Sequence, residues 1–499
     1  MSYPGVYVEE LPSGTRTITG VSTSITAFVG RAARGPLNES VIIHSFGDYE
    51  RIFGGIFRES KMSYAVYHYF LNGGSTAVIV RIDNAGKVTE FEKSGTTLKF
   101  ESANPGSWGN NLSININEDI NDTDPDKANL FNLAVTDSGT NEVESFLNLS
   151  INNKSSKFVT KVLQNESRLI RVKDGESAID KVPSAGDYTI KDKSKEGTDG
   201  NNLKSNDVLG SQSSKTGIFA LDNVDLFNIL CIPPYDKDDE AATDVYPAAN
   251  QYCKERRAIL LVDPPLSWKK ISDAVNGAKS NMISENATMF FPRLIMRDVK
   301  DDNRLASFVP CGAVAGVIAR NDTQRGIWKA PAGIEASLAG VSDLQVRLTD
   351  DENGQLNPLG VNCLRIMPSA GPVIWGSRTL KGADRLADQW KYLPVRRTAL
   401  YIEESLYRGT QWVVFEPNDE SLWTQIRLNI GAFMHDLFLK GAFQGSDPKQ
   451  AYLVKCDKET TTQYDIDRGI VNILVGFAPL KPAEFVILKI QQLAGQEKT

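Results

Sequence analysis

Apolar and polar residues alternate in short runs near the end of the chain. From Tyr452 to Ile490 these runs have the period of strands, and one of them stops at Gly476. Phe485–Ile490 consists almost entirely of strand-forming residues. The connector before it, Phe477–Pro482, contains two prolines, which fix φ and keep the backbone extended. The pattern predicts a C-terminal arm at 481–499 whose strand projects away from its own sheet.

The start of the chain predicts a second arm, at 1–24. Prolines and glycines bracket one short strand there, and no helical period is present. Free termini are commonly frayed, which is one interpretation of both ends. The other is that each arm adds a strand to the sheet of a neighbouring copy, because an exposed apolar edge strand needs a partner. The residues expected to pair are Val6, Tyr7, Val8 and Glu9 in one arm and Phe485, Val486, Ile487, Leu488 and Ile490 in the other.

Strand and helix patterns alternate at 25–82 and again at 218–360. This order predicts one α/β middle domain with a buried, mostly parallel sheet. Val309–Ala319 is rich in small apolar residues, which indicates a helix that packs closely against its neighbours. The main expected strands are Ile25–Gly30, Thr76–Ile82, Phe227–Ile232, Ala258–Asp263 and Ala287–Phe291, and the main expected helices are Val245–Arg257 and Ser267–Ser280.

Residues 83–217 interrupt this domain with Asn, Asp, Ser, Lys and Gly. Short alternating strands recur within them, at Leu112–Ile116, Phe131–Val135 and Leu169–Val172. We interpret the segment as a β-rich insertion that faces solvent, with a disordered region as the alternative. A third, α+β domain is predicted at 361–480. Its long helix, Asp419–Leu439, has one apolar face and Asn418 as the expected N-cap.

Composition is that of an ordinary globular protein of several domains. The net charge is −7 without a long basic run, so nucleic acid is not an expected partner. The five cysteines are scattered, which indicates neither a disulfide framework nor a zinc site. No apolar stretch is long enough to cross a bilayer, so direct membrane insertion is not expected, and we expect assembly in a reducing cytoplasm.

No segment carries a recognisable catalytic group. The three histidines, His44, His68 and His435, lie in different segments, and His68 is expected to be a satisfied structural residue. Gly312–Gly316 lacks the lysine and hydroxyl of a phosphate loop, so helix packing explains it better. Asp122, Asp124 and Asp126 start like a calcium loop, but the later ligand positions fail. We therefore predict no catalytic, cofactor or metal residues.

Three blocks of sequence resemble the contractile tail sheath proteins of phages and phage-like injection particles. They are AFVGRAARGPLNESVIIHSFGDYERIFGG with YAVYHYFLNGGSTAVIVR, then VPCGAVAGVIARNDTQRGIWKAPAG, and the closing FAPLKPAEFVILKIQQ. The resemblance covers the chain up to Ile82 and nearly everything after Ile218, but not the insertion, which is where such proteins vary. The PGVYVEE start and the APLKPAEF ending are most similar to sheaths of extracellular contractile injection systems.

The resemblance implies a structural subunit, not an enzyme. Such subunits stack in hexameric rings, along a six-start helix, around an inner tube, and contraction drives the tube through a target envelope. The implied partners are other copies of the chain, the inner tube protein, and baseplate and terminator or cap proteins. Part of the implied fold resembles a subtilisin-like α/β layer, although no Asp/His/Ser grouping supports proteolysis here. The arms are implied to interlock with the C-terminal domains of adjacent subunits.

Two questions stay open at the level of sequence. Arg427 and Lys440, on the long helix, are candidates for facing the inner tube, with a solvated amphipathic helix as the alternative. For the chain as a whole, the alternatives are an adhesin that binds through the insertion and a degenerate hydrolase on an α/β scaffold.

Overall fold

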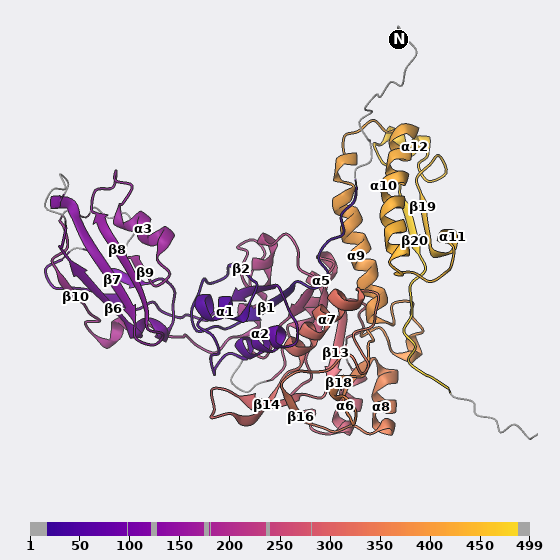
Figure 1. The fold of residues 1–499 in the computed structure, drawn as a ribbon, viewed down its shortest axis with the longest axis horizontal. Coiled ribbons are helices and arrows are strands. Elements are labelled where there is room, and N and C mark those ends of the chain that lie inside the picture. Colours follow the sequence, from indigo (N-terminus) through magenta and orange to yellow (C-terminus); the bar gives the residue numbers. More distant parts are fainter. Residues whose placement is uncertain are drawn as a thin grey trace, which may run out of the picture. The chain divides into compact units, whose positions relative to one another are not determined.

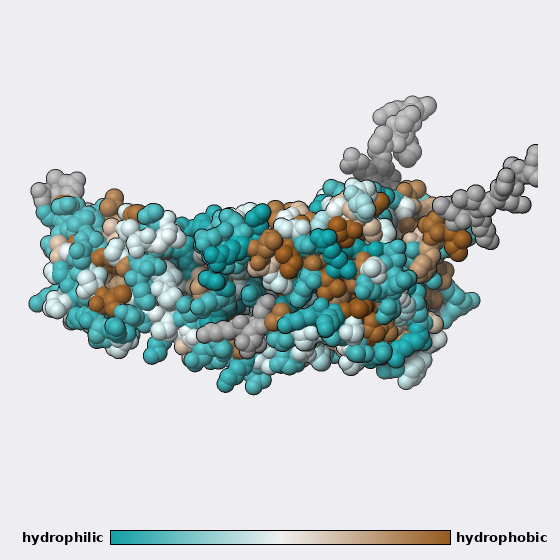
Figure 2. Space-filling model, turned by 90° about the horizontal axis from the view of Figure 1, so that it is seen from below, coloured by the Kyte–Doolittle hydropathy of each residue, from teal (hydrophilic) through white to brown (hydrophobic). Residues whose placement is uncertain are grey.

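The computed structural model describes residues 17–96, 98–120, 127–173, 179, 181–235, 240–280 and 282–487 (Figure 1). These residues form two compact units. The larger unit comprises Ser22–Arg320 and Ala332–Ala387. The smaller unit contains the described residues up to Val21, Asn321–Pro331 and those from Asp388 onward. On the face drawn in Figure 2, hydrophilic residues predominate and apolar residues form separate patches.

An eight-stranded sheet organises the larger unit, in the order β18-β17-β13-β12-β11-β1-β3-β2. The strands from β17 to β3 are parallel, and β18 and β2 are antiparallel edge strands. In chain order the parallel strands run 2-1-3-4-5-6, so the sheet is doubly wound and its direction reverses between β1 and β11. The strands are β1 (Thr26–Gly30), β2 (Ser40–Ile43), β3 (Ala77–Arg81), β11 (Ile229–Cys231), β12 (Ile259–Val262), β13 (Ala287–Phe291), β17 (Val361–Met367) and β18 (Gly371–Ile374).

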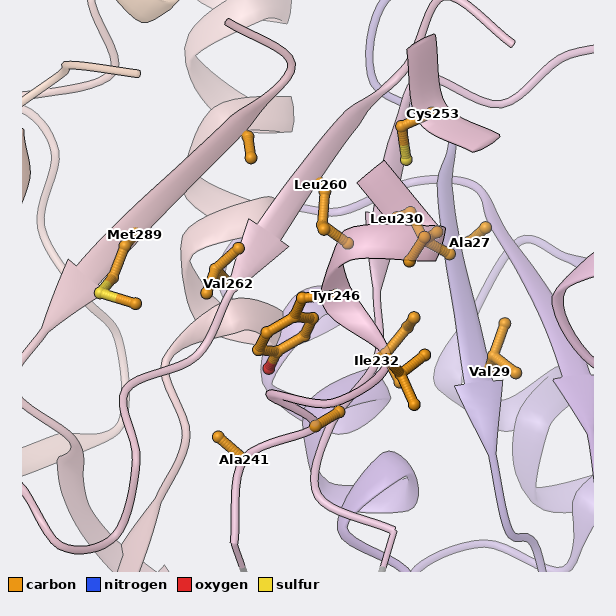
Figure 3. Close-up of a cluster of buried hydrophobic side chains, with 14 of the residues drawn as sticks. Ala27, Val29, Leu230, Ile232, Ala241, Tyr246, Cys253, Leu260, Val262 and Met289 are labelled. Atoms are coloured by element: carbon orange, nitrogen blue, oxygen red, sulfur yellow. The ribbon is translucent and has the colours of Figure 1, made fainter. Parts of the chain in front are cut away.

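Helices cover both faces of this sheet. Alternate side chains of β1, β11, β12 and β13 form one buried cluster with α5 (Tyr246–Glu255), which contributes Tyr246 and Cys253 (Figure 3). The intervening residues face the other layer, where Phe28 packs edge-on against Tyr69 of α2 (Lys61–Leu71) at 5.6 Å between ring centroids. The remaining helices of the unit are α1 (Phe46–Phe53), α6 (Ile271–Ala278), α7 (Cys311–Arg325) and α8 (Asp350–Leu356). The predicted α/β layer is confirmed.

Glycines allow α7 to approach α2 very closely. A Cβ on Gly312 would lie 2.1 Å from the carbonyl oxygen of Ala65, and one on Gly316 would lie 2.4 Å from that of Tyr69. Any larger side chain at either position would collide with the backbone of α2. This confirms that Gly312–Gly316 serves helix packing.

The insertion has its own hydrophobic cluster, built around Phe100, Phe131 and Leu163. It contains a four-stranded and a three-stranded sheet, so the β-rich interpretation is confirmed. Arg34 contacts Asp137 and Glu142 at 3.4 Å, and thereby ties the insertion to the α/β layer. Its elements are β4 (Glu90–Phe91), β5 (Phe100–Ser102), β6 (Leu112–Asn117), β7 (Leu130–Asp137), β8 (Glu142–Ser150), α3 (Val159–Glu166), β9 (Ile170–Val172), β10 (Gly186–Tyr188) and α4 (Ser205–Leu209).

The boundary expected at Val361 differs from the structure. Val361 pairs with Met289 in the eight-stranded sheet, so β17 and β18 belong to the larger unit and not to the smaller one. A second small sheet of the larger unit consists of β14 (Leu294–Asp298), β15 (Arg304–Phe308) and β16 (Val341–Leu344). The smaller unit contains α9 (Leu393–Gly409), α10 (Glu420–Leu439), α11 (Pro448–Ala451), β19 (Tyr452–Lys455), α12 (Gln463–Asp467) and β20 (Leu474–Phe477).

His68 lies inside the α/β layer, as expected of a structural residue, but it is not satisfied. Its side chain packs edge-on against Phe308 at 5.2 Å between centroids. The buried Nδ1 has no hydrogen-bond partner among the described residues. Burial lowers the pKa of His68 to about 4, because the charged ring would have to leave water. The five cysteines are buried and free.

This histidine predicts a loss of stability in mild acid. Above pH 6.5 the ring is neutral in both the folded and the unfolded chain. As the pH falls from 6.5 towards 4, only the unfolded chain takes up the proton, which costs the folded state about 3 kcal/mol in total. The free energy of unfolding, measured with urea at pH 7.5 and at pH 4.5, should therefore fall more in the wild type than in His68→Phe. Equal losses in the two proteins would contradict this.

Candidate inter-subunit interface

The smaller unit ends in a two-stranded antiparallel sheet, β19–β20, in which Tyr452 pairs with Phe477 and Lys455 with Leu474. The inward side chains Val454 and Val475 pack against the core formed by α10. The outward Leu453 and Leu474 are about half exposed, at 51% and 52%. Among the described residues, β19 and β20 pair only with each other, so the outer edge of each strand is open. Open edges of this kind accept further strands.

The N-terminal segment is fixed along α9 before it reaches the larger unit. Ile18 is buried in the core of the smaller unit, at 6% exposure. A Cβ on Gly409, the last residue of α9, would lie 2.6 Å from Ile18, so glycine is needed there for close approach. The backbone N–H of Val21 donates to Ser405 Oγ at 3.2 Å. From Ile18 onward the chain is thus packed against the rest of the protein, although the sequence predicted an arm as far as residue 24.

The C-terminal segment leaves from the opposite end of α9. The N–H of Ala478 donates to Ala451 at 2.8 Å, and the N–H of Gln444 donates to Ala478 at 2.9 Å. Tyr392, the N-cap of α9, donates its hydroxyl proton to Glu484 at 3.2 Å. The next three residues, Phe485, Val486 and Ile487, are 75–80% exposed and lie in no strand. The segment between β20 and Phe485 is therefore bonded to the smaller unit, and the exposed apolar segment begins only at Phe485.

The two segments are attached to the body at opposite ends of one helix. Helix α9 has 17 residues, so Tyr392 and Gly409 are about 25 Å apart. Any strand continuing upstream of Ile18 and any strand continuing from Phe485 start from different places on this unit.

A buried ion pair holds this unit together. The guanidinium of Arg397, in the second turn of α9, donates to both carboxylate oxygens of Asp322, at 2.8 and 2.5 Å. The two side chains are 3% and 2% exposed. The paired geometry links Asn321–Pro331 to α9 through charge-assisted bonds shielded from water.

Helix α10 presents an uncharged stripe to solvent. The exposed positions Leu428, Ala432 and Leu439 continue a spacing of four and three residues that is typical of a helix–helix seam. Leu428 and Leu439 are 59% and 71% exposed. Nothing lies within 4 Å of the position that a Cβ on Gly431 would take, so the centre of the stripe is open. The full stripe is Ser421, Gln425, Leu428, Ala432, His435 and Leu439.

The two charged candidates on α10 flank this stripe. Arg427 bonds Glu420 at 2.8 Å and also the carbonyl oxygen of Cys456, so it is engaged within its own chain. Lys440 pairs with Asp436 at 2.7 Å, and this hydrogen bond raises the pKa of the lysine. Whether either residue faces a tube stays a prediction.

Two local predictions about this unit are wrong. Asp419 caps α10 by accepting from the N–H of Leu422, whereas Asn418 instead donates to the carbonyl of Ile470. Strand β20 also passes through Gly476 and ends at Phe477. Gly476 pairs with Leu453 within the β19–β20 ladder, so the glycine does not end the strand.

Several predicted site residues lie outside the described residues. They are Val6, Tyr7, Val8, Glu9, Leu488 and Ile490, together with Asp122, Asp124 and Asp126 of the calcium-like segment. Within the described ranges, no three His, Cys, Asp or Glu side chains come close enough to hold a metal ion. None of the helices described there combines the length and hydrophobicity needed to span a bilayer.

Comparison with protein families gives two adjacent matches. The phage tail sheath protein central domain matches residues 217–380, and the phage tail sheath C-terminal domain matches residues 387–492. Together these stretches make up more than half of the chain. The tail sheath protein of Vibrio phage KVP40 is 26% identical over 191 residues, which are 38% of this chain. The match spans about a quarter (26%) of that curated relative's length.

Solved structures match the whole chain in fold. The helical sheath of the anti-feeding prophage in its contracted state has a TM-score of 0.60 at 24% identity, covering 99% of both chains. The contracted sheath of the extracellular contractile injection system PVC has a TM-score of 0.60 at 22% identity, covering 99% of this chain and 98% of its own. The similarity includes the insertion, although the sequence resemblance does not.

The buried ion pair predicts a large effect of a nearly isosteric substitution. Asp322→Asn leaves the Arg397 guanidinium without its carboxylate, which should cost about 3–5 kcal/mol. Urea unfolding, followed by the intrinsic fluorescence of the tryptophans, measures the change. Lys440→Met is the control, because its exposed pair with Asp436 should contribute less than about 0.5 kcal/mol. Similar small effects of both substitutions would rule out a stabilising role for the buried pair.

Proposed function

This chain belongs to the contractile tail sheath proteins of phage-tail-like injection systems, and we propose that it polymerises as stacked hexameric rings, in a six-start helix, around an inner tube. Contraction of this sheath drives the tube through a target cell envelope. The observation that carries the proposal is the open-edged β19–β20 sheet, in a unit from which the chain's two ends start at opposite ends of α9.

The arms connect the subunits by strand addition. Val6–Glu9 and Phe485–Ile490 each pair with an open edge of β19–β20 in a neighbouring copy, and backbone hydrogen bonds supply the affinity. An arm paired by about 4–6 such bonds, at about 1 kcal/mol each, keeps two copies joined while other contacts change. Since arm and acceptor are different surfaces, the contact is head-to-tail and generates an open helical array.

Contraction needs no fuel in this scheme. The energy is stored when the sheath assembles in an extended, metastable state, and it is released by rigid-body rearrangement of subunits that the arms keep connected. The role is structural and not enzymatic, and the family likeness of the sheath neighbours supports it. These comparisons give the adhesin alternative no support.

The other assignments follow from this arrangement. The insertion faces outward, where its polar loops keep the particle soluble. The sheath ends bind a baseplate and a terminator or cap protein, and assembly takes place in the cytoplasm before the particle acts outside. A baseplate of the anti-feeding prophage contains a chain of the same fold, which supports the baseplate contact. The likeness of the α/β layer to subtilisin stays a prediction.

The uncharged stripe of α10 supports this helix as the surface that faces the tube. A helix on the tube protein can lie along Leu428, Ala432 and Leu439 without removing any charge of the stripe from water. Lys440 and Arg427 then lie at the rim of the contact, where charges set orientation more than affinity. Arg427 contributes less, because it is bonded within its own chain.

The arm proposal predicts that truncations separate folding from assembly. Deleting residues 1–16 or 485–499 keeps Ile18 and Glu484 in place, so the subunit should retain its helix content and melting temperature. Electron microscopy should show no cylinders from either truncation. The matched point variants are Val486→Pro, which removes one backbone donor and should impair assembly, and Val486→Thr, which should not. Normal cylinders from a truncation would refute strand addition by that arm.

The tube proposal predicts a separate defect. Leu428→Glu places a charge in the centre of the stripe, and co-sedimentation with the tube protein should fall at least about tenfold. Lys440→Glu should have a smaller effect that disappears at high salt. Leu147→Glu, at a 67% exposed position of the insertion, is the matched control and should leave co-sedimentation unchanged. If Leu428→Glu and the control behave alike, α10 does not face the tube.

A further inference from the structure

The connection between α9 and α10 holds an aromatic side chain entirely in solvent. Phe415 has a relative exposure of 102%, and its neighbour Val414 is 60% exposed. The backbone of Phe415 is left-handed, with φ of 70°. Bulky residues rarely adopt this conformation, because Cβ crowds the following carbonyl group. An exposed ring on a strained backbone contributes nothing to the stability of the isolated subunit.

The segments on both sides of this pair are fixed. Trp412 and Val413 pack against the core of the smaller unit, and the N–H of Glu416 closes a turn onto Val413 at 3.1 Å. Asn418 donates to the carbonyl of Ile470 at 3.0 Å and accepts from the Trp423 indole at 2.9 Å. Val414 and Phe415 therefore form a rigid apolar projection, which loses little entropy when it is buried by a partner.

The position of the projection identifies its partner. It follows Gly409, the end of α9 at which Ile18 packs and from which the N-terminal arm starts. On the proposed function, that arm reaches a neighbouring sheath subunit, so the projection is continuous with a contact between copies of this chain. Strain maintained at one exposed aromatic residue is typical of a binding site, and buried aromatic anchors dominate protein interfaces.

We propose that Val414 and Phe415 insert into a second copy of this chain and act as an anchor between sheath subunits. The inference rests on the proposed function, because it requires neighbouring copies. The contact is head-to-tail, like the proposed arm contacts.

Photo-crosslinking tests the identity of the partner. p-Benzoylphenylalanine is introduced at position 415 of the full chain, and cylinders formed with the tube protein are irradiated. Adducts between two sheath chains are expected. Adducts with the tube protein, or no adduct in well-formed cylinders, would overturn the inference and leave the proposed function intact. Failure of the unsubstituted chain to form cylinders would instead count against the proposed function.

Substitution by glycine tests whether the strain is kept for assembly. Phe415→Gly relieves the left-handed conformation, so the unassembled subunit should melt about 2 °C higher. Its assembly into cylinders, measured by sedimentation, should nevertheless fall at least about tenfold because the anchor is lost. Val143→Ser, at a 59% exposed position of the insertion, is the control and should assemble normally. Normal assembly of Phe415→Gly would contradict the proposal.

Discussion

The unpaired backbone N–H and C=O groups at the edges of β19–β20 are the constraint on which the proposed assembly depends. A sheet of two strands has as many outward-facing N–H and C=O groups as paired ones, and it is marginal unless something packs against it. Here α10 covers one face, and the edges stay open among the described residues. On the proposed function, these groups are satisfied by strands exchanged between copies, and the exposed strand-forming residues at Phe485–Ile487 are suited to this.

The α/β layer shows how a fold shared with many enzymes can serve a structural role. In doubly wound sheets, ligands bind at the carboxyl ends of the strands where the strand order reverses, here between β1 and β11. Arg31, which directly follows β1, donates to the carbonyl oxygen of Asp199 at 2.7 Å. Beyond β11, the hydroxyl of Tyr235 donates to Asp244 at 2.8 Å. The returning end of the insertion is thus bonded, through Asp199, to the residue that follows β1 at this edge of the sheet.

The sequence predicted what depends on neighbouring residues and missed what depends on distant ones. The apolar face of α10 and the alternation in β6 and β7 are local patterns, and both elements form as expected. No element was predicted for α9, because Arg397 breaks its apolar face and its partner Asp322 is 75 positions away. The pairing of Val361 with Met289, which moves a domain boundary, is likewise long-range. For the candidate interface, the arms stay a prediction from the sequence, whereas the burial of Ile18 and the exposure of Phe415 depend on tertiary packing that no local pattern shows.

If the two arms join neighbouring copies as proposed, their starting points at the two ends of α9 pass tension through this helix. A pull on one arm enters the body near Gly409, and a pull on the other enters near Tyr392, so tension in a connected lattice runs along the helix axis. Helical hydrogen bonds lie nearly parallel to that axis, so axial tension stretches them in series, turn after turn. The ion pair of Arg397 holds the helix in its second turn, near the Tyr392 end of this line. In a sheath that shortens abruptly, α9 would carry the tension between the two arms of each subunit. Lengthening of its turns would make this connection elastic.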